Sequence, residues 1–390
     1  MEVKSGYKQT EAGTIPDDWE VRDIRSVCKL INGRGFKPFE WKTSGLPIIR
    51  IQNLNGSDEF NYFDGSYDRK LEVSTGQLLF AWSGSRGTSF GPHLWLGPLG
   101  LLNYHTWRIQ VDNYEINPAF FFHALKKLTE FIEGRAHGAS ALVHVQKWEM
   151  EGFTFPAPRD PLEQRAIASA LSDVDALLSG LDRLLAKKRD LKQATIQQLL
   201  TGQTRLPGFL EEWEVKRLGE VVTFQRGHDL PQHARRQGPI PIISSAGITD
   251  YHDIEMVSPP GVITGRYGTI GKLFFVTEPF WPLNTTLYVS DFHGNDPKFV
   301  FYLLQRFDFH AFSGKSGVPG VNRNDLHSEL VLLPNNHAEQ LAIATVLSDM
   351  DTELAALEAR REKTRLLKQG MMQELLTGKT RLITPERDDA

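Results

Sequence analysis

The sequence predicts an α+β protein with an internal pseudo-two-fold repeat: two globular mixed α/β domains separated by two long antiparallel coiled-coil helices. Three observations predict this architecture. One segment of 44 residues occurs twice without a gap, each copy has heptad spacing of apolar residues, and the remaining segments contain short apolar runs between turn residues. The chain of 390 residues is also longer than one hydrophobic core usually serves.

The repeated segment spans residues 163–206 and 339–382, and 24 of its 44 positions are identical at a constant offset of 176. Both copies begin with Glu-Gln, and they end in LLTGQTRL and LLTGKTRL. Gly202 and Gly378 follow the last apolar residues, where a glycine in the left-handed conformation commonly ends a helix. Each copy therefore predicts one helix of about 38 residues, which corresponds to about 57 Å.

The apolar residues of each copy follow alternating spacings of four and three, the pattern of a coiled-coil seam. A lone helix would leave such a seam in water, so the two copies are expected to pair with each other. Polar residues interrupt the seam at Lys188, Lys192, Arg361 and Lys368, and the pairing is expected to loosen there or to shift to Leu191 and Leu367. The residues predicted to form the helix pair are Ile167, Leu171, Val174, Leu178, Leu181, Leu185, Ile343, Leu347, Met350, Leu354 and Leu357.

A fainter similarity connects the segments that precede the helices. DDWEVRDIRSVCKLINGRGF (17–36) matches EEWEVKRLGEVVTFQRGHDL (211–230), and later runs match with a shrinking offset, as loop shortening on a preserved scaffold would produce. Strands are expected in the runs rich in Val, Ile, Phe and Trp, with further helices near 117–132 and 296–310. The predicted organisation is an N-terminal extension (1–15), a first domain (16–157), a central helix (158–206), a second domain (207–334), a C-terminal helix (335–382) and a tail (383–390).

Composition excludes several classes of protein. The net charge of −4 argues against a protein that coats nucleic acid by bulk charge, although local basic patches remain possible. Cys28 is the only cysteine, so it predicts a small buried apolar residue rather than a disulfide or a zinc cluster. No apolar run approaches the length of a membrane span and the first residues are polar, so no membrane association and a cytoplasmic location are expected.

Apparent catalytic motifs fail on spacing. GRYGTIGK (265–272) has five residues between Gly265 and Gly271, and Leu273 follows where a phosphate-binding loop needs Ser or Thr. Asn117-Pro118 matches Asp296-Pro297 in the repeat and predicts a helix N-cap rather than a methyltransferase loop. Pro16-Asp17 with Glu-Val-Arg at 20–22 is a nuclease-like fragment that the second copy lacks, and the histidines show no metal-ligand spacing. We therefore expect no catalytic residues and no metal.

The EQxxIAxxLSDxD helix start, the LLTGxTRL helix end, the WEVRDI and WEVKRL entries to the two domains, and the duplicated order of domain and helix resemble the specificity subunit of a type I restriction-modification enzyme. The resemblance covers roughly residues 6–382. It implies that each globular domain is a target recognition domain for one half of a split site in double-stranded DNA. It also implies that the antiparallel helices act as a spacer and a docking surface for two modification subunits, through which restriction subunits join.

The resemblance further implies that the chain itself is not an enzyme and holds no cofactor. S-adenosylmethionine, ATP and magnesium would belong to the partner subunits. Two alternatives remain open from the sequence: a self-sufficient DNA methyltransferase or endonuclease, and a coiled-coil adaptor that binds only proteins. On the helices, the charged residues Arg165, Asp182, Lys187 and Arg189 are candidates for partner docking or simply a solvated face.

Loops that combine glycine with hydrogen-bonding side chains are the expected DNA readers. Arg86 and Arg266 are favoured, because they are expected to occupy matching places: each follows an apolar strand and precedes a Gly-Thr pair. His228 and His233 could add to a basic patch near Arg235 and Arg236, and Ser316 lies beside another candidate. The candidate DNA-binding residues are Arg34, Lys37, Arg50, Gln52, Asn53, Ser85, Arg86, Thr88, Arg226, Arg235, Arg236, Ser244, Ser245, Arg266, Tyr267, Thr269, Lys272, Lys315, Asn322 and Arg323.

Overall fold

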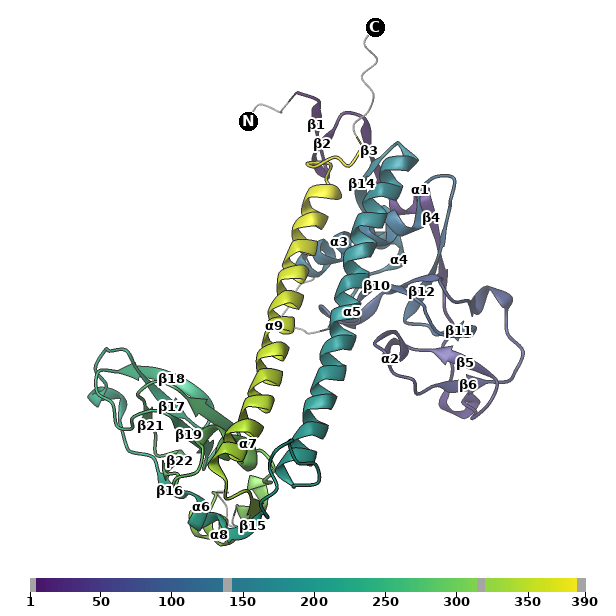
Figure 1. Ribbon diagram of the computed structural model, residues 1–390. Helices are drawn as coiled ribbons and strands as arrows, with labels where there is room; N and C mark the ends of the chain where they lie inside the picture. Colours follow the sequence, from purple (N-terminus) through teal and green to yellow (C-terminus); the bar gives the residue numbers. More distant parts are fainter. Residues whose placement is uncertain (1–4, 136–141, 314–319, 384–390) are drawn as a thin grey trace. The chain divides into compact units, whose positions relative to one another are not determined.

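The computed structural model describes residues 5–135, 142–313 and 320–383, and it divides into two compact units (Figure 1). Unit 1 comprises residues 1–180 with 361–390, and unit 2 comprises residues 181–360. Each unit therefore contains one globular domain, part of the first long helix and part of the second.

The helices belong to three length classes. Two are long, α5 (Pro161–Leu200) and α9 (His337–Leu375), and two are intermediate, α3 (Pro118–Arg135) and α7 (Pro297–Leu304). The short α-helices are α1 (Ile24–Val27), α2 (Ile51–Leu54), α4 (Lys147–Gly152), α6 (Leu218–Val221) and α8 (Arg323–Ser328). The 3-10 turns are η1 (Pro38–Glu40), η2 (Arg69–Leu71), η3 (Gln232–Ala234) and η4 (Phe309–Phe312).

The strands are short in both units, as the short apolar runs predict. Unit 1 contains β1 (Tyr7–Thr10), β2 (Gly13–Pro16), β3 (Trp19–Asp23), β4 (Cys28–Asn32), β5 (Leu46–Ile49), β6 (Asn61–Phe63), β7 (Glu72–Val73), β8 (Leu78–Ala81), β9 (Ser83–Ser85), β10 (Gly91–Leu94), β11 (Gly100–Leu102), β12 (Thr106–Val111), β13 (Leu142–His144) and β14 (Thr154–Pro158). Unit 2 contains β15 (Glu214–Arg217), β16 (Thr223–Arg226), β17 (Ile240–Ser244), β18 (Gly247–His252), β19 (Gly261–Gly265), β20 (Leu273–Val276), β21 (Trp281–Pro282), β22 (Thr286–Asp291) and β23 (Leu330–Leu333).

The sheet topology repeats between the units. The order β10-β8-β12-β4 in unit 1 corresponds to β20-β19-β22-β16 in unit 2, and the pair β14-β3 corresponds to β23-β15. Likewise, β5 pairs parallel with β11 and antiparallel with β6, as β17 does with β21 and β18. The internal pseudo-two-fold repeat and the mixed α/β domains predicted from the sequence are therefore present. Unit 1 adds β7 and the pair β13-β9, and its α3 is longer than α7.

The long helices contribute to the core of each domain. In unit 1, Ile167 and Leu171 of α5 are buried with Met372 and Leu375 of α9 in the same apolar cluster as the sheet and α3. In unit 2, Ile343 and Leu347 of α9 are buried with Ile196, Leu199 and Leu200 of α5 against the equivalent elements. The start of each helix thus packs on the domain that precedes it, together with the end of the other helix.

The glutamine of each Glu-Gln pair, Gln164 or Gln340, fixes the start of its long helix. Gln164 accepts the backbone N–H of Asn117 at 2.8 Å and donates to the carbonyl of Pro158 at 2.8 Å. Gln340 makes the same bonds to Asp296 and Pro334 in unit 2, at 2.9 and 2.8 Å. The side chains of Asn117 and Asp296 cap the helices that follow them, α3 and α7, so the N-cap prediction is confirmed.

A buried ion pair joins the helix ends to the domains. In unit 1, Arg381 donates to Glu163 (Nε–Oε1 2.5 Å), and the indole of Trp19 donates to the same carboxylate at 3.2 Å. Glu163 is only 1% exposed. Burial alone would lower the pKa of Arg381, but its hydrogen bonds to Glu163 and Asp18 outweigh this effect and raise the pKa.

Unit 2 repeats this ion pair with the other copy of the motif. Arg205 donates to Glu339 (Nε–Oε1 2.6 Å), and Trp213 donates to that carboxylate at 3.2 Å. The LLTGxTRL end of each helix therefore closes on the Glu-Gln start of the other helix. Gly202 and Gly378 have φ angles of +70° and +69°, which confirms the predicted left-handed helix ends.

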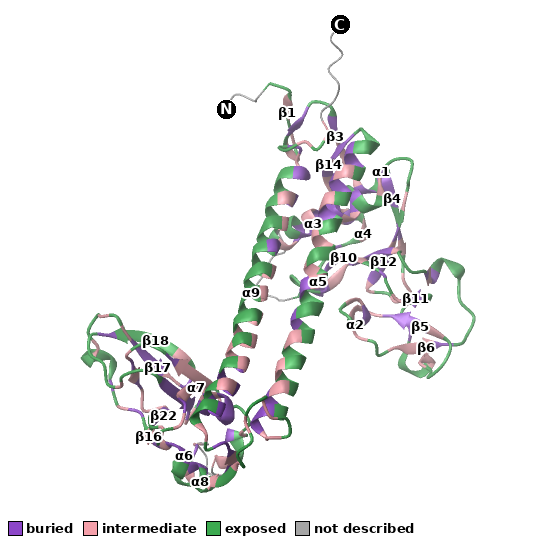
Figure 2. Cartoon of the chain, viewed as in Figure 1, coloured by how far each residue is buried: buried purple, intermediate pink, exposed green. Residues whose placement is uncertain are grey.

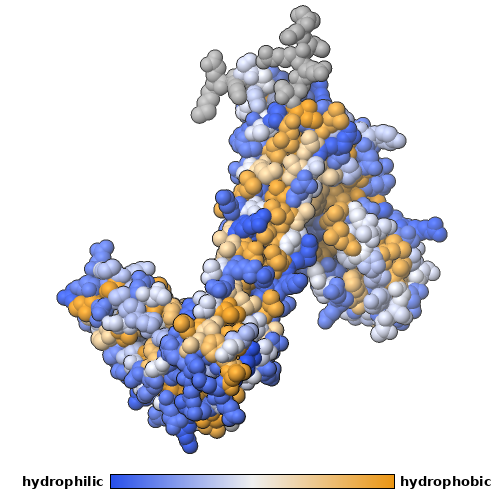
Figure 3. Space-filling model, in the orientation of Figure 1, coloured by the Kyte–Doolittle hydropathy of each residue, from blue (hydrophilic) through white to orange (hydrophobic). Residues whose placement is uncertain are grey.

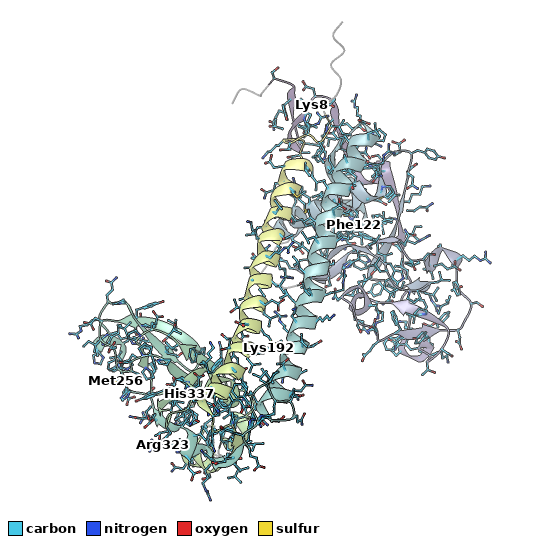
Figure 4. All side chains as sticks on the ribbon, viewed as in Figure 1. Lys8, Phe122, Lys192, Met256, Arg323 and His337 are labelled. Atoms are coloured by element: carbon cyan, nitrogen blue, oxygen red, sulfur yellow. The ribbon has the colours of Figure 1, made fainter. Side chains whose placement is uncertain are left out.

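The helix seam differs from the prediction at its polar interruptions. Leu191 and Leu367 are exposed at 50% and 58%, so the seam does not shift to them. Instead, Lys192 pairs with Asp351 at 2.5 Å in unit 2, where it lies between α5 and α9 (Figure 4). Lys368 pairs with Asp175 at 2.5 Å in unit 1. The predicted shift to Leu191 and Leu367 is wrong, because at each of these interruptions a lysine pairs with an aspartate of the antiparallel helix. Neither segment reveals this register alone.

Other seam positions vary in burial along the helices. Leu181 and Leu185 are buried, whereas Val174, Leu178 and Met350 are half-buried, as are Leu354 and Leu357, and most remaining residues of α5 and α9 are half-buried or exposed (Figure 2). Arg361 is also half-buried, and Lys188 pairs with Glu353 of α9 at 2.7 Å. Within each unit, the paired stretches of α5 and α9 run in opposite directions.

The end of α7 and the burial of Cys28 can also be compared with the sequence predictions. The helix expected near 296–310 ends at Leu304, because η4 begins at Phe309 after a short turn. Cys28 is buried, and burial raises the pKa of its thiol to about 12. Within the described ranges, every helix is too short or too polar to cross a membrane.

Candidate nucleic-acid interface

Unit 2 brings residues from three separate loops around one hollow of about 390 Å³. Arg226 ends β16, Arg266 follows β19, and Arg323 begins α8, where Figure 4 labels it. The described residues that line it are Arg226, Arg266, Leu287, Gly320, Val321, Asn322, Arg323 and Asn324. Four of the predicted DNA-binding residues therefore gather at one place, and the described lining residues include no carboxylate.

The backbone of Arg266 is held on both sides. Its N–H donates to the carbonyl of Thr285 at 2.8 Å, and its own carbonyl accepts the N–H of Val321 at 3.0 Å. The guanidinium lies 4.6 Å from the ring centroid of Tyr267. Gly320 allows this arrangement, since a Cβ there would lie 2.1 Å from the Tyr267 ring. The charged group of Arg266 is thus oriented by a ring that is itself fixed.

The other two arginines of the hollow are more exposed. Arg226 pairs with Asp229 at 3.4 Å, and the side chain of Arg226 is 51% exposed. Close backbone approach shapes this loop, because a Cβ at Gly227 would lie 2.0 Å from the carbonyl oxygen of Leu283. Asn322 caps α8 by accepting the N–H of Asn324 at 3.0 Å, and this bond fixes the position at which Arg323 leaves the loop.

A second hollow of about 440 Å³ in unit 2 is lined by Gln232, Arg235, Arg236, Gln237, Gly238, Asp250 and Tyr251. Both arginines are already paired: Arg235 with Asp250 at 3.1 Å and Arg236 with Asp253 at 3.0 Å. His233 lies on η3 nearby and is exposed, whereas His228 contacts the hydroxyl of Tyr288 at 3.2 Å. Two aspartates therefore largely balance the positive charge of Arg235 and Arg236.

The remaining predicted residues of unit 2 stabilise turns. The hydroxyl of Ser244 donates to Gly247 O at 3.1 Å, and Ser245 is buried. Lys272 donates to the carbonyl of Ala246 at 3.2 Å, and Thr269 is exposed in the turn after β19. These contacts close the β17–β18 turn against the loop that follows β19. Lys315 and Ser316 lie outside the described residues.

In unit 1, the predicted arginines are held by the fold. Arg34 pairs with Glu40, and its guanidinium lies 4.8 Å from the ring of Phe36 and 4.9 Å from that of Phe63. Arg50 donates to Asn61 at 2.7 Å over the ring of Trp41. Both guanidinium groups therefore stabilise their own loops.

The neighbouring polar residues of unit 1 differ in accessibility. Asn53 is 7% exposed and bonds to Arg50 N, Ser57 O and Glu59 O, so its side chain is fully used by the loop. The Asn53 side chain therefore stabilises its own loop. Gln52 donates to Glu59 O at 3.1 Å yet remains exposed, as does Lys37 at the start of η1.

Ser85, Arg86 and Thr88 form an exposed turn between β9 and β10. Thr88 donates to Ser85 O at 3.3 Å, and the backbone N–H of Gly87 donates to Glu133 at 2.8 Å. This turn is accessible, but it does not occupy the position in unit 1 that Arg266 occupies in unit 2.

Strand register identifies Trp82 as the counterpart of Arg266. The carbonyl of Trp82 accepts the N–H of Val145 at 3.0 Å, as that of Arg266 accepts Val321. The expectation that Arg86 and Arg266 occupy matching places is therefore wrong. The β9–β13 pair inserts extra residues after β8 in unit 1, and these displace the Gly-Thr pair on which the sequence match rested.

Residues that the sequence did not select occupy the matching surface of unit 1. Register places Asn32 where unit 2 has Arg226, since Asn32 faces Trp107 as Arg226 faces Leu287. Lys147 begins α4 as Arg323 begins α8. The constant offset of 176 that relates the long helices also relates these two residues, and it could have identified Lys147.

Aromatic rings surround Trp82. Its indole donates to the carbonyl of Tyr104 at 2.9 Å, and its ring lies 5.7 Å from Tyr104, 5.3 Å from His105 and 6.0 Å from Trp107 by centroid. Tyr104 is 46% exposed. Unit 1 therefore presents an aromatic surface where unit 2 presents arginines. Among the described residues, no three His, Cys, Asp or Glu side chains are grouped as metal ligands would be.

The chain was compared with known protein families. The family model described as the type I restriction modification DNA specificity domain matches residues 16–187 and again 210–367. The chain belongs to this family. Each match covers one globular domain and most of the long helix that follows it, so the duplication seen in topology and ion pairs is a duplication of the specificity domain.

Relatives resemble the chain over nearly its whole length. The MjaVIII specificity subunit of Methanocaldococcus jannaschii is 23% identical over 431 aligned residues, which cover 97% of each chain. A putative MjaX specificity subunit of the same organism is 24% identical, with 98% of each chain covered. The crystal structure of a type I S subunit from M. genitalium has a TM-score of 0.66 at 16% identity and covers 96% of this chain and 98% of that one. This last likeness concerns the fold alone.

Proposed function

We propose that this specificity subunit reads a bipartite site in double-stranded DNA, with one half-site bound by each unit. The main support is the duplication of a whole DNA specificity domain, complete with its sheet order and its Glu–Arg–Trp ion pair. A duplicated domain gives one chain the near-two-fold symmetry that other DNA readers obtain from two chains. Two half-sites also multiply discrimination, since each good bidentate base contact adds about 1–3 kcal/mol.

The proposal assigns two roles to the long helices. A helix of 40 residues such as α5 is about 60 Å long, which is long enough to set the gap between two half-sites. Hydrophobic side chains also reach the surface along both helices (Figure 3), among them Leu177, Leu184 and Leu191 of α5 at seven-residue spacing. Such a stripe suits the docking of helices from modification subunits. Because the chain has two equivalent halves, we expect two modification subunits to dock.

Charged residues would frame that docking surface. Arg165, Asp182 and Lys187 are exposed on α5, whereas Arg189 is paired with Glu358 at 2.5 Å. In this proposal the chain performs no chemistry: modification subunits bring S-adenosylmethionine and flip the target base, and restriction subunits bring ATP and magnesium. The negative net charge of −4 is compatible with DNA binding in an assembly whose other subunits neutralise phosphates.

Four residues inserted into each of α5 and α9 test the spacing role. One added turn lengthens the helix pair by about 6 Å, and a base-pair step is about 3.4 Å. Methylation mapping in a host that expresses the system should show a gap altered by one or two base pairs with both half-sites unchanged. A control with four residues appended after Ala390 should leave the site unchanged. An altered half-site, or an unaltered gap, would refute the spacing role.

Methylation by the chain alone separates the proposal from a self-sufficient methyltransferase. The isolated chain with S-adenosylmethionine should methylate no DNA, and activity should require modification subunits. A gel-shift assay with those subunits tests the protein-only adaptor, for which no shift of duplex DNA is expected.

A further inference from the structure

The hollow in unit 2 carries more positive charge than the described carboxylates beside it balance. Three arginines and two asparagines line it, and Asp229 is the carboxylate that contacts one of them, at 3.4 Å from Arg226. Arg266 and Arg323 form no ion pair or side-chain hydrogen bond in the part of the chain that the structure describes. By contrast, the arginines of the second hollow and of the buried ion pairs all have carboxylate partners.

Converging guanidinium groups repel one another, so such an arrangement favours a ligand that is rich in hydrogen-bond acceptors. DNA offers two acceptors of this kind: backbone phosphate, and the O6 and N7 atoms of guanine in the major groove. Both accept two bonds from one guanidinium. The positions of the three arginines indicate which of them suits each acceptor.

Arg266 is the most constrained of the three. Its backbone is bonded on both sides, its guanidinium lies 4.6 Å from the Tyr267 ring, and Gly320 lets that ring pack closely. A planar guanidinium that is held against an aromatic ring loses little conformational entropy when it forms two parallel hydrogen bonds. Arg226 and Arg323 stand at the rim, exposed to solvent, where long charged side chains adapt to a backbone.

We propose that Arg266 reads a guanine in the half-site bound by unit 2, while Arg226 and Arg323 contact the phosphates beside it. This inference rests on the proposed function and assigns a base to one of its two reading surfaces. Asn322 and Asn324 complete the polar wall of the hollow, but Asn322 is already engaged in capping α8.

The decisive variant is Arg266→Lys, which keeps the charge and removes the planar fork. The full chain is assembled with its modification subunits, and bound duplexes are selected from a library in which both half-sites are randomised. Arg217→Lys, an exposed arginine at the end of β15 outside both hollows, is the matched control. Melting curves of all variants establish that they remain folded.

The wild type should select a bipartite site with guanine at one position of one half-site. Arg266→Lys should lower the preference for guanine at that position by about 10-fold or more and leave the other half-site intact. Arg323→Ala should weaken binding to all sequences alike and reduce by about one the slope of log affinity against log salt. The control should change neither property.

The outcomes separate the inference from the function on which it rests. If the wild type selects a bipartite site and Arg266→Lys only weakens binding uniformly, Arg266 contacts phosphate and the inference is wrong, while the proposed function stands. Selection of adenine, thymine or cytosine at every position that Arg266→Lys affects also overturns it. If the assembled wild type selects no bipartite site, the proposed function itself fails.

Discussion

The two units share a scaffold but differ on the surface where DNA is expected to lie. Their sheet orders match, and in each unit a buried glutamate binds an arginine and a tryptophan. The equivalent surface positions, by contrast, hold different chemistry. Unit 2 has Arg226, Arg266 and Arg323 where unit 1 has Asn32, Trp82 and Lys147.

This difference shows which positions the fold constrains. The buried glutamate tolerates no change without leaving an unpaired charge in the core, so both copies keep it. A loop that follows a buried strand has no such constraint, because its side chains meet solvent or a ligand. Loops of this kind can therefore differ between two units that share one scaffold.

The largest expected effect concerns the shared ion pair. Arg381→Ala leaves the carboxylate of Glu163, which is 1% exposed, without its cation, and the free energy of unfolding of unit 1 should fall by about 3–5 kcal/mol. Arg205→Ala should destabilise unit 2 by less than that, because Glu339 is the one carboxylate that Arg205 binds among the described residues, whereas Arg381 also binds Asp18 at 2.8 Å. Chemical denaturation followed by hydrogen exchange in each unit measures both.

Arg365→Ala provides the control, since Arg365 pairs with Glu362 at 2.7 Å on the exposed face of α9, where solvent screens the attraction and the pair contributes little to stability. An equal, small effect for all three variants would mean that the ion pairs are not what holds the helix ends to the domains.

A second contrast lies where each domain meets the helix seam. In unit 1, His123 contacts the hydroxyl of Ser172 at 3.1 Å, beside Lys126, Asp175 and Lys368. In unit 2, the equivalent position on α7 is Tyr302, whose hydroxyl donates to Asp351 at 2.7 Å. Burial raises the pKa of this tyrosine, whereas burial and the neighbouring Lys126 lower the pKa of His123 to about 4.

Unit 1 should therefore be the more acid-sensitive unit. An unfolded histidine takes up a proton near pH 6.5, while folded His123 remains neutral down to about pH 4. The contribution of neutral His123 to the free energy of unfolding of unit 1 is complete above about pH 6.5. It is lost as the pH falls toward 4, and the loss is about 3 kcal/mol at most. Hydrogen exchange of α3 and α7 across this range measures the difference between the units.

His123→Gln removes the titrating group and should flatten the loss of stability of unit 1 between pH 6.5 and 4.5. Lys126 and Asp175 remain charged in this window, so they contribute little to the slope. If α3 and α7 lose protection in parallel, or if His123→Gln leaves the slope unchanged, the histidine does not distinguish the units.

The sequence was most informative where a feature depends on residues that are close together in the chain. The helix starts, the glycine helix ends and the N-caps at Asn117 and Asp296 all follow from residues that are local in sequence. The ion pairs at the polar positions of the helix seam could not be predicted in this way, because the pairing of Lys192 with Asp351 depends on the register of two segments far apart in the chain.

Reading loops were harder to predict than the scaffold. The place of Arg266 is defined by hydrogen bonds to neighbouring segments, and the strand register gives its counterpart as Trp82 rather than Arg86. Asn53 has the composition of a reader but is consumed by its own loop. Residue type alone cannot tell a side chain that faces a ligand from one that stabilises a turn.

The smallest expected effect tests whether unit 1 reads DNA by apolar contact instead of charge. Trp82 and the half-exposed Tyr104 offer rings that can pack on base edges or a thymine methyl group, contacts that release no counterions. Trp82→Ala in the assembled complex should weaken cognate binding by about 1 kcal/mol and leave the salt slope unchanged, unlike Arg323→Ala. Trp95→Phe, at a tryptophan that is 4% exposed in the same unit, controls for altered packing. If Trp82→Ala instead reduces the salt slope as Arg323→Ala does, the two units bind DNA by the same electrostatic means, and the contrast in their surfaces has no counterpart in recognition.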